Sequence, residues 1–89
     1  MQIETALAAV SELRDTMVPS RERIQGLLDT MSKMPRATTQ FNRARRKYVE
    51  LLASFVAIHD SSLRVMSEFE ATANRVLTTM RGEASASPT

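Results

Sequence analysis

The residues best suited to bind a charged partner lie in the middle of the chain. Six basic residues and no acidic one occur between Thr30 and Val49: Lys33, Arg36, Arg43, Arg45, Arg46 and Lys47. The segments before and after this stretch each hold five acidic and three basic residues. Arginine, which makes up four of the six, pairs with carboxylate or phosphate through two parallel hydrogen bonds. The sequence therefore predicts that this stretch binds an acidic partner.

An ordinary solvated helix face is the alternative interpretation of the same residues. Glu50 could pair with Arg46 or Lys47 along a helix, for roughly 0.2–0.5 kcal/mol. However, like charges three or four residues apart destabilise a helix, and bases near a helix N-terminus oppose its dipole. A sequence that carries both penalties favours the binding interpretation.

An acidic protein surface, a nucleic acid and an anionic lipid surface all fit such a stretch. Phe41 and Tyr48 are expected on the packed side of a helix, which leaves them poorly placed for stacking on bases. Lipid binding needs apolar residues beside the bases, and here these are expected to pack within protein. A larger acidic protein is therefore the preferred partner and nucleic acid the alternative. Met34 and Met80 add adaptable apolar side chains that a partner can contact, although filling a core is their default role.

No residue pattern supports catalysis or metal binding. His59 is the single histidine and the chain has no cysteine, so the ligands of a transition-metal site are missing. Glu68 and Glu70 are two residues apart and point in different directions on a helix. Glycine-rich phosphate loops and serine–base–acid sets are absent from the sequence. The sequence therefore predicts a protein that is not an enzyme and takes no cofactor.

Apolar residues that recur every seven positions predict helices in the first part of the chain. One row has the members Ile3, Val10, Met17, Ile24 and Met31, and a second row has the members Ala6, Leu13, Ser20, Leu27 and Met34. Pro19 removes a backbone donor, and Ser20 can cap a new helix. We therefore expect two helices, about 2–17 and 20–33, that face the same neighbour.

A second periodic segment follows a break at Pro35. One row has the members Phe41, Tyr48, Phe55, Ser62, Phe69 and Val76, and the other has the members Ala44, Leu51, Ile58 and Val65. These rows predict a helix over about 39–81, capped by Thr38 or Thr39, with 59–62 as its weak point. Gly82 is expected to end it. The chain is then a single helical domain, 1–82, with a disordered tail, 83–89.

These elements predict an all-α fold, either an antiparallel helical hairpin or a small three- or four-helix bundle. Folding back about Arg36 places Ile3 opposite Phe69 and leaves the apolar residues of 73–80 uncovered. Either the long helix breaks near Asp60 and wraps into a bundle, or a second copy or a partner covers the surplus. The sequence leaves both outcomes open.

The function expected from these features is that of a small helical binding regulator: an adaptor, antiactivator or inhibitor that docks on a larger protein such as a transcriptional regulator. A nucleic-acid-binding protein and a structural subunit that forms a helical homo-oligomer are the alternatives. No apolar segment approaches the length of a membrane span, and the N-terminal residues lack the features of a secretory signal. A cytoplasmic location is therefore expected.

Overall fold

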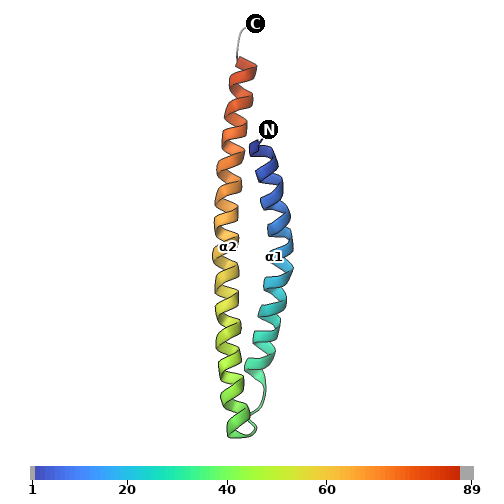
Figure 1. The fold of residues 1–89 in the computed structure, drawn as a ribbon, viewed down its shortest axis with the longest axis vertical. Coiled ribbons are helices and arrows are strands. Elements are labelled where there is room, and N and C mark those ends of the chain that lie inside the picture. Colours follow the sequence, from blue (N-terminus) through green and yellow to red (C-terminus); the bar gives the residue numbers. More distant parts are fainter. Residues whose placement is uncertain (1, 87–89) are drawn as a thin grey trace.

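The computed structural model describes residues 2–86, with side chains for residues 2–82. This part of the chain forms two helices and no strand: α1, Gln2–Lys33, and α2, Thr39–Ala86. The helices lie side by side and run in opposite directions (Figure 1). The all-α prediction is confirmed, and the elongated shape fits the helical hairpin. Residues 2–86 do not form a third or fourth helix.

The hairpin is a thin rod. Its radius of gyration is 20.9 Å and its extents are 78 × 17 × 15 Å, whereas a compact domain of this length would have a radius of gyration of about 12 Å. Two helices in one layer cannot enclose a large interior. Within the described residues, the side chains that are less than one-tenth exposed are Leu52, Val56, Ala73 and Leu77. All four belong to α2, and α1 buries none completely.

Helix α1 is continuous through Pro19, so the prediction of two helices, about 2–17 and 20–33, is wrong. Pro19 cannot donate to the carbonyl of Asp15, but both residues are exposed, so water can satisfy that carbonyl. The apolar row keeps the same phase on both sides of Pro19, and a continuous helix holds Met17 and Ile24 against α2. Figure 1 shows α1 bowed outward in its middle. Packing against α2 therefore outweighs the tendency of proline to break a helix.

Helix α2 is also continuous, without a break at 59–62, and it passes through Gly82 to end at Ala86. Asp60 does not cap a new helix, because its carboxylate accepts hydrogen bonds from Arg21 of α1 at 2.9 and 3.3 Å. The tail expected over 83–89 is therefore helical as far as Ala86. Residues 87–89 lie outside the described part of the chain.

The loop between the helices is held by its own side chains. The hydroxyl of Thr38 accepts a hydrogen bond from the backbone N–H of Phe41 at 3.1 Å, so Thr38 rather than Thr39 caps α2. The Asn42 side chain accepts from the backbone N–H of Ala37 at 3.0 Å and donates to the carbonyl of Ala37 at 3.3 Å. These bonds fix the path of the loop against the first turn of α2.

The register between the helices differs from the one expected. Ion pairs join Arg21 to Asp60 and Glu4 to Arg81, which places the start of α1 opposite residues near Leu77 rather than Phe69. The first turns of α2 extend beyond the end of α1, where the loop runs beside them, and at the other end α2 extends beyond the start of α1 (Figure 1). Ala73 and Leu77 are therefore buried, so the prediction that residues 73–80 overhang is wrong for these two, whereas Val76 and Met80 remain 40% exposed.

The rows of side chains that pack between the helices are only partly those expected. The row from Ile3 to Met31 packs as predicted, but its neighbour in the interface is the row Leu7, Arg14, Arg21 and Leu28. On α2 the packed rows contain Val49, Leu52, Val56, His59, Leu63, Met66, Glu70, Ala73 and Leu77. The remaining predicted rows stay open to solvent because one neighbouring helix covers only part of a wide apolar stripe.

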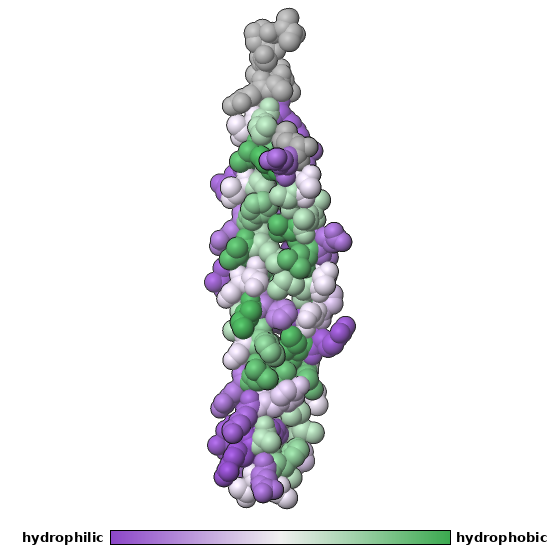
Figure 2. All heavy atoms as spheres, in the orientation of Figure 1, coloured by the Kyte–Doolittle hydropathy of each residue, from purple (hydrophilic) through white to green (hydrophobic). Residues whose placement is uncertain are grey.

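One open row, Ala44, Leu51, Ile58 and Val65 of α2, has large side chains that are 47–63% exposed. We call the other two open rows the apolar face. It consists of Ala6, Leu13, Ser20 and Leu27 of α1, Met34 directly after α1, and Phe41, Tyr48, Phe55, Ser62, Phe69 and Val76 of α2. Its large side chains, from Leu13 to Val76, remain 39–51% exposed. Figure 2 shows hydrophobic atoms along the middle of one broad face of the rod, over both helices, with hydrophilic atoms at the edges.

Candidate functional site

The six basic residues of the middle stretch lie together at the loop end of the rod. We call this set, Lys33, Arg36, Arg43, Arg45, Arg46 and Lys47, the basic pole. Lys33 ends α1, Arg36 lies in the loop, and the other four belong to the first turns of α2. Figure 2 shows a strongly hydrophilic group of atoms over α2 at this end. The hairpin therefore concentrates the positive charge of the sequence at one end.

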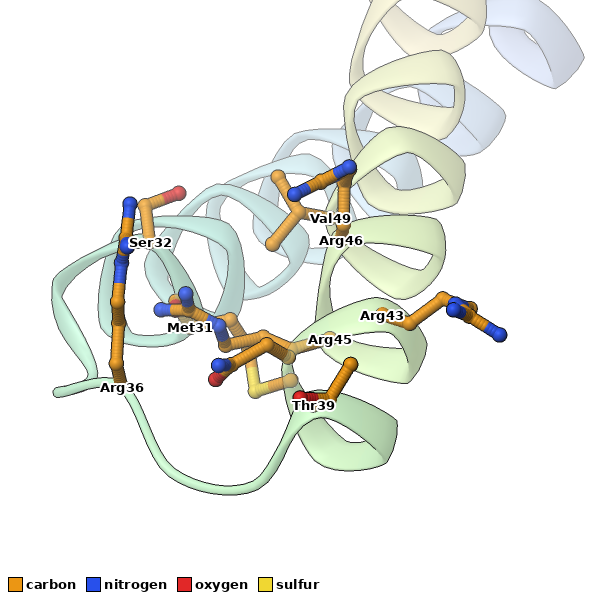
Figure 3. A pocket seen from close by; sticks show the side chains of 9 residues that line it. Met31, Ser32, Arg36, Thr39, Arg43, Arg45, Arg46 and Val49 are labelled. Atoms are coloured by element: carbon orange, nitrogen blue, oxygen red, sulfur yellow. The ribbon is translucent and has the colours of Figure 1, made fainter.

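The four arginines of the basic pole line a hollow of about 510 Å³ that is open to solvent, whereas Lys33 and Lys47 do not line it. Its lining comes from the end of α1, the loop and the start of α2: Met31, Ser32, Arg36, Thr39, Asn42, Arg43, Arg45, Arg46 and Val49. Figure 3 shows that Arg45 reaches from α2 toward Met31, whereas Arg43 points away from α1. Ser32, Thr39 and Asn42 were not predicted as site residues, because only the loop geometry brings these polar side chains beside the arginines.

Arg45 has a structural role in this hollow. Its Nη1 donates to the carbonyl oxygens of Met31, at 3.3 Å, and Met34, at 2.7 Å. The Met31 carbonyl lies in the last turn of α1 and also accepts from the backbone N–H of Met34 at 3.4 Å, whereas the Met34 carbonyl follows the helix end directly. A cation at this position also complements the helix dipole. Arg45 therefore holds the end of α1 and is less available to a partner than its position in the sequence indicates.

The other five basic residues are exposed and have no acidic partner among the described residues. Among residues 2–82, the basic residues that form ion pairs are Arg14, Arg21 and Arg81, and none of them lies at the loop end. In particular, Glu50 forms no ion pair with Arg46 or Lys47, so the solvated-face interpretation loses its compensating contact. An uncompensated group of cations creates a positive potential that attracts anionic surfaces.

The two methionines proposed as partner contacts lie far apart. Met34 is 39% exposed and adjoins the basic pole, whereas Met80 is 40% exposed and lies near Arg81, at the other end of the rod. Met34 belongs to the apolar face, so that face begins beside the basic pole. A single partner surface can contact Met34 together with the arginines, but not Met80.

A second polar cluster lies between the helices near the middle of the rod. Arg14 pairs with Glu70 at 3.2 Å, and the Ser20 hydroxyl lies 3.4 Å from Nε2 of His59. Nδ1 of His59 lies 2.8 Å from the carbonyl oxygen of Phe55, which fixes this nitrogen as the donor and Nε2 as the acceptor from Ser20. Both ring nitrogens are therefore occupied by structural contacts, and no carboxylate orients the ring for proton transfer.

The pKa values of the central ion pair follow from its hydrogen bonds. Two hydrogen bonds from Arg21 lower the pKa of Asp60, and the same contact raises the pKa of Arg21. Glu70 accepts from Arg14 through Oε2, while its Oε1 is buried without a hydrogen-bond partner. Sequence reasoning missed this cluster because it selected apolar rows. The clue was that Arg14 and Arg21 are seven residues apart, in phase with Leu7 and Leu28.

The described residues contain no group of three or more His, Cys, Asp or Glu side chains that could hold a metal ion. Neither α1 nor α2, over residues 2–86, has a segment long and apolar enough to span a membrane. Comparison of the chain with protein-family models, curated proteins and solved structures gives no match.

Proposed function

We propose that the protein is a non-enzymatic binding protein that docks its basic pole, and the adjoining start of the apolar face, onto an acidic surface of a larger protein. An adaptor, antiactivator or inhibitor of a cytoplasmic regulator, such as a transcriptional regulator, fits this description. The observation that carries the proposal is the hollow at the loop end, where Arg36, Arg43 and Arg46 are exposed without an acidic partner.

Carboxylates of a protein suit this hollow better than a nucleic acid does. No aromatic side chain lines the hollow, and Phe41 and Tyr48 belong to the apolar face. Sequence-tolerant binding of single strands relies on such aromatic side chains. The chain also carries a net charge of only +2, with acidic residues concentrated away from the loop. The guanidinium groups of the arginines around this open hollow can instead form bidentate pairs with aspartate or glutamate side chains.

Charge reversal with a matched control tests the proposal. The variant R36E/R43E/R46E reverses the pole, and R23E/R64E/R75E reverses three exposed arginines elsewhere with the same change in net charge. Each tagged protein is used to capture partners from an extract of the native host. We expect the pole variant to lose an acidic protein that the wild type and the control retain. Equal capture by all three proteins would contradict the proposal.

The main alternative is a nucleic-acid partner. Fluorescence anisotropy measurements of binding to duplex DNA and to RNA test it. Nucleic-acid binding requires measurable affinity at low salt that falls steeply as salt rises. We expect no such affinity. Salt-sensitive binding that the pole variant loses would replace the acidic protein with a nucleic acid as the partner.

A further inference from the structure

No residue among 2–82 covers the apolar face, and its composition differs from that of the packed rows. Its eleven positions hold no charged residue, whereas the rows packed between the helices include Arg14, Arg21 and Glu70. The hairpin thus packs some charged residues between its helices, while these uncharged and mostly apolar rows stay in contact with water. Large continuous apolar surfaces of this kind mark interaction sites in soluble proteins.

The rows from the two helices form one surface. Ala6 of α1 and Phe69 and Val76 of α2 line the same hollow of about 330 Å³, at the open end of the rod. Phe41 and Tyr48 continue this surface to the loop, along the side of α2 opposite to Arg43 and Arg46. The apolar face therefore runs along the rod on the side away from the hollow of the basic pole.

We propose that a second copy of the chain covers the apolar face, in a two-fold symmetric four-helix bundle with the two loops at opposite ends. Three independent observations favour this occupant: the amount of exposed surface, the position of the two serines in the face, and the distribution of charge along the rod.

The exposed area of the chain is large enough to supply the interface of a stable dimer. The chain exposes 6809 Å², whereas a compact monomer of 9.9 kDa is expected to expose about 5,200 Å². The excess is about 1,600 Å² per chain, or about 3,200 Å² for a pair. Obligate homodimers bury roughly 2,000–5,000 Å². An interface between two hairpins that buries this excess would therefore lie within the range of obligate homodimers.

The two polar positions of the apolar face lie at one level. Ser20 is the polar member of the α1 row and Ser62 that of the α2 row. Ser20 contacts His59, which lies within one helical turn of Ser62, so both hydroxyls lie near the middle of the face. A two-fold axis through this level brings the serines of the two copies together and places apolar residues against apolar residues above and below.

Charge favours the arrangement with loops at opposite ends. The open end, residues 2–16 and 66–82, holds five acidic and three basic residues, whereas the loop end, 30–49, holds six basic residues alone. Loops at the same end would bring two basic poles together. Opposite ends instead bring each basic pole beside the acidic end of the other copy, and such complementarity fixes orientation.

This inference goes beyond the proposed function and does not depend on it. A second copy would cover the start of the apolar face, including Met34, but the hollow of the basic pole lies on the other side of the rod. Each dimer would therefore present two such hollows, one at each end, and a larger partner would contact the hollow alone. A monomeric hairpin would keep its basic pole, and a dimer with an inert basic pole would keep its apolar interface. The two proposals can therefore fail separately.

Sedimentation equilibrium over a range of concentrations tests the dimer. F55D places a carboxylate in the apolar face, and A57D places one at an exposed position of α2 outside it. We expect the wild type and A57D to dimerise and F55D to weaken the dimer about 100-fold or more, because a buried charge would lack a partner. Circular dichroism checks that F55D keeps its helices, and F69D serves as a second variant if it does not.

Disulfide cross-linking tests the orientation, because the chain has no cysteine of its own. Tyr48 lies fourteen residues before Ser62 and Val76 lies fourteen residues after it. Tyr48 of one copy should therefore face Val76 of the other copy across the two-fold axis. We expect S62C to cross-link with itself and Y48C to cross-link with V76C in a mixture. Cross-linking of Y48C with M34C instead would place the loops at the same end and overturn the proposed arrangement.

Two other results would overturn the proposal as a whole. One is a wild-type chain that stays monomeric at high micromolar concentration. The other is a monomer that binds phosphatidylglycerol vesicles through the apolar face and loses this binding in F55D, which would identify a lipid surface as the occupant.

Discussion

Arg45 provides the sharpest test of the structure at the loop end, because the sequence assigns it to partner binding and the structure assigns it to the end of α1. Arg45→Met keeps an unbranched apolar stem but removes both hydrogen bonds to the carbonyls of Met31 and Met34. A hydrogen bond to a charged group contributes about 1.5–3 kcal/mol. Both bonds come from one Nη1 atom, and the side chain is only half-buried. We therefore expect a total loss of about 2 kcal/mol.

Thermal unfolding followed by far-ultraviolet circular dichroism measures this loss. For a domain of this size, about 2 kcal/mol corresponds to a fall in Tm of roughly 8–16 °C. All proteins are compared at one concentration, since association raises Tm. Arg46→Met is the matched control, because Arg46 is exposed and unpaired, and its Tm should stay close to that of the wild type. Equal Tm values for the two variants would refute the structural role of Arg45.

Three further predictions concern the helices and their contacts. Pro19→Ala should stabilise the protein by about 1–3 kcal/mol in urea unfolding, because alanine restores the hydrogen bond to the Asp15 carbonyl; no gain would mean that α1 is broken at Pro19. Leu77→Ala should destabilise it by about 2–3 kcal/mol, because Leu77 is 4% exposed; a negligible change would argue against the observed register. The lowered pKa of Asp60 means that its contribution to stability is present above the ordinary carboxyl pKa of 3.8 and is lost as the pH falls below it. Asp60→Asn should therefore flatten the decline of Tm below about pH 4, and an unchanged decline would contradict the pairing with Arg21.

The periodicity of the sequence predicts the helices well, but it does not predict which rows of side chains pack. The row from Ile3 to Met31 could pair with the row three residues later, which includes Leu13, or with the row four residues later, which includes Arg14. Composition favours Leu13, yet the hairpin packs Arg14, because Glu70 of α2 lies opposite and forms an ion pair with it. Such a choice depends on a contact between helices that a pattern along one helix cannot show.

Local rules gave wrong helix boundaries where tertiary contacts act against them. Pro19 and Asp60 both carry the signals of a helix break, and both lie inside continuous helices. The register was wrong for a related reason: the loop runs back along the first turns of α2, and no residue type reveals that path. The position of the basic residues was easier to predict, because a single turn between two helices necessarily gathers its neighbours at one end.

The central claim is that the loop end binds carboxylate-rich surfaces. The most direct measurement is a titration of the ¹⁵N-labelled protein with a short poly-L-glutamate peptide, with poly-L-glutamine as the neutral control. We expect chemical-shift changes at Arg36, Arg43, Arg46 and their neighbours that the neutral peptide does not produce. Shifts of similar size at Arg75 and Arg81, or no shifts at the loop end, would contradict the claim.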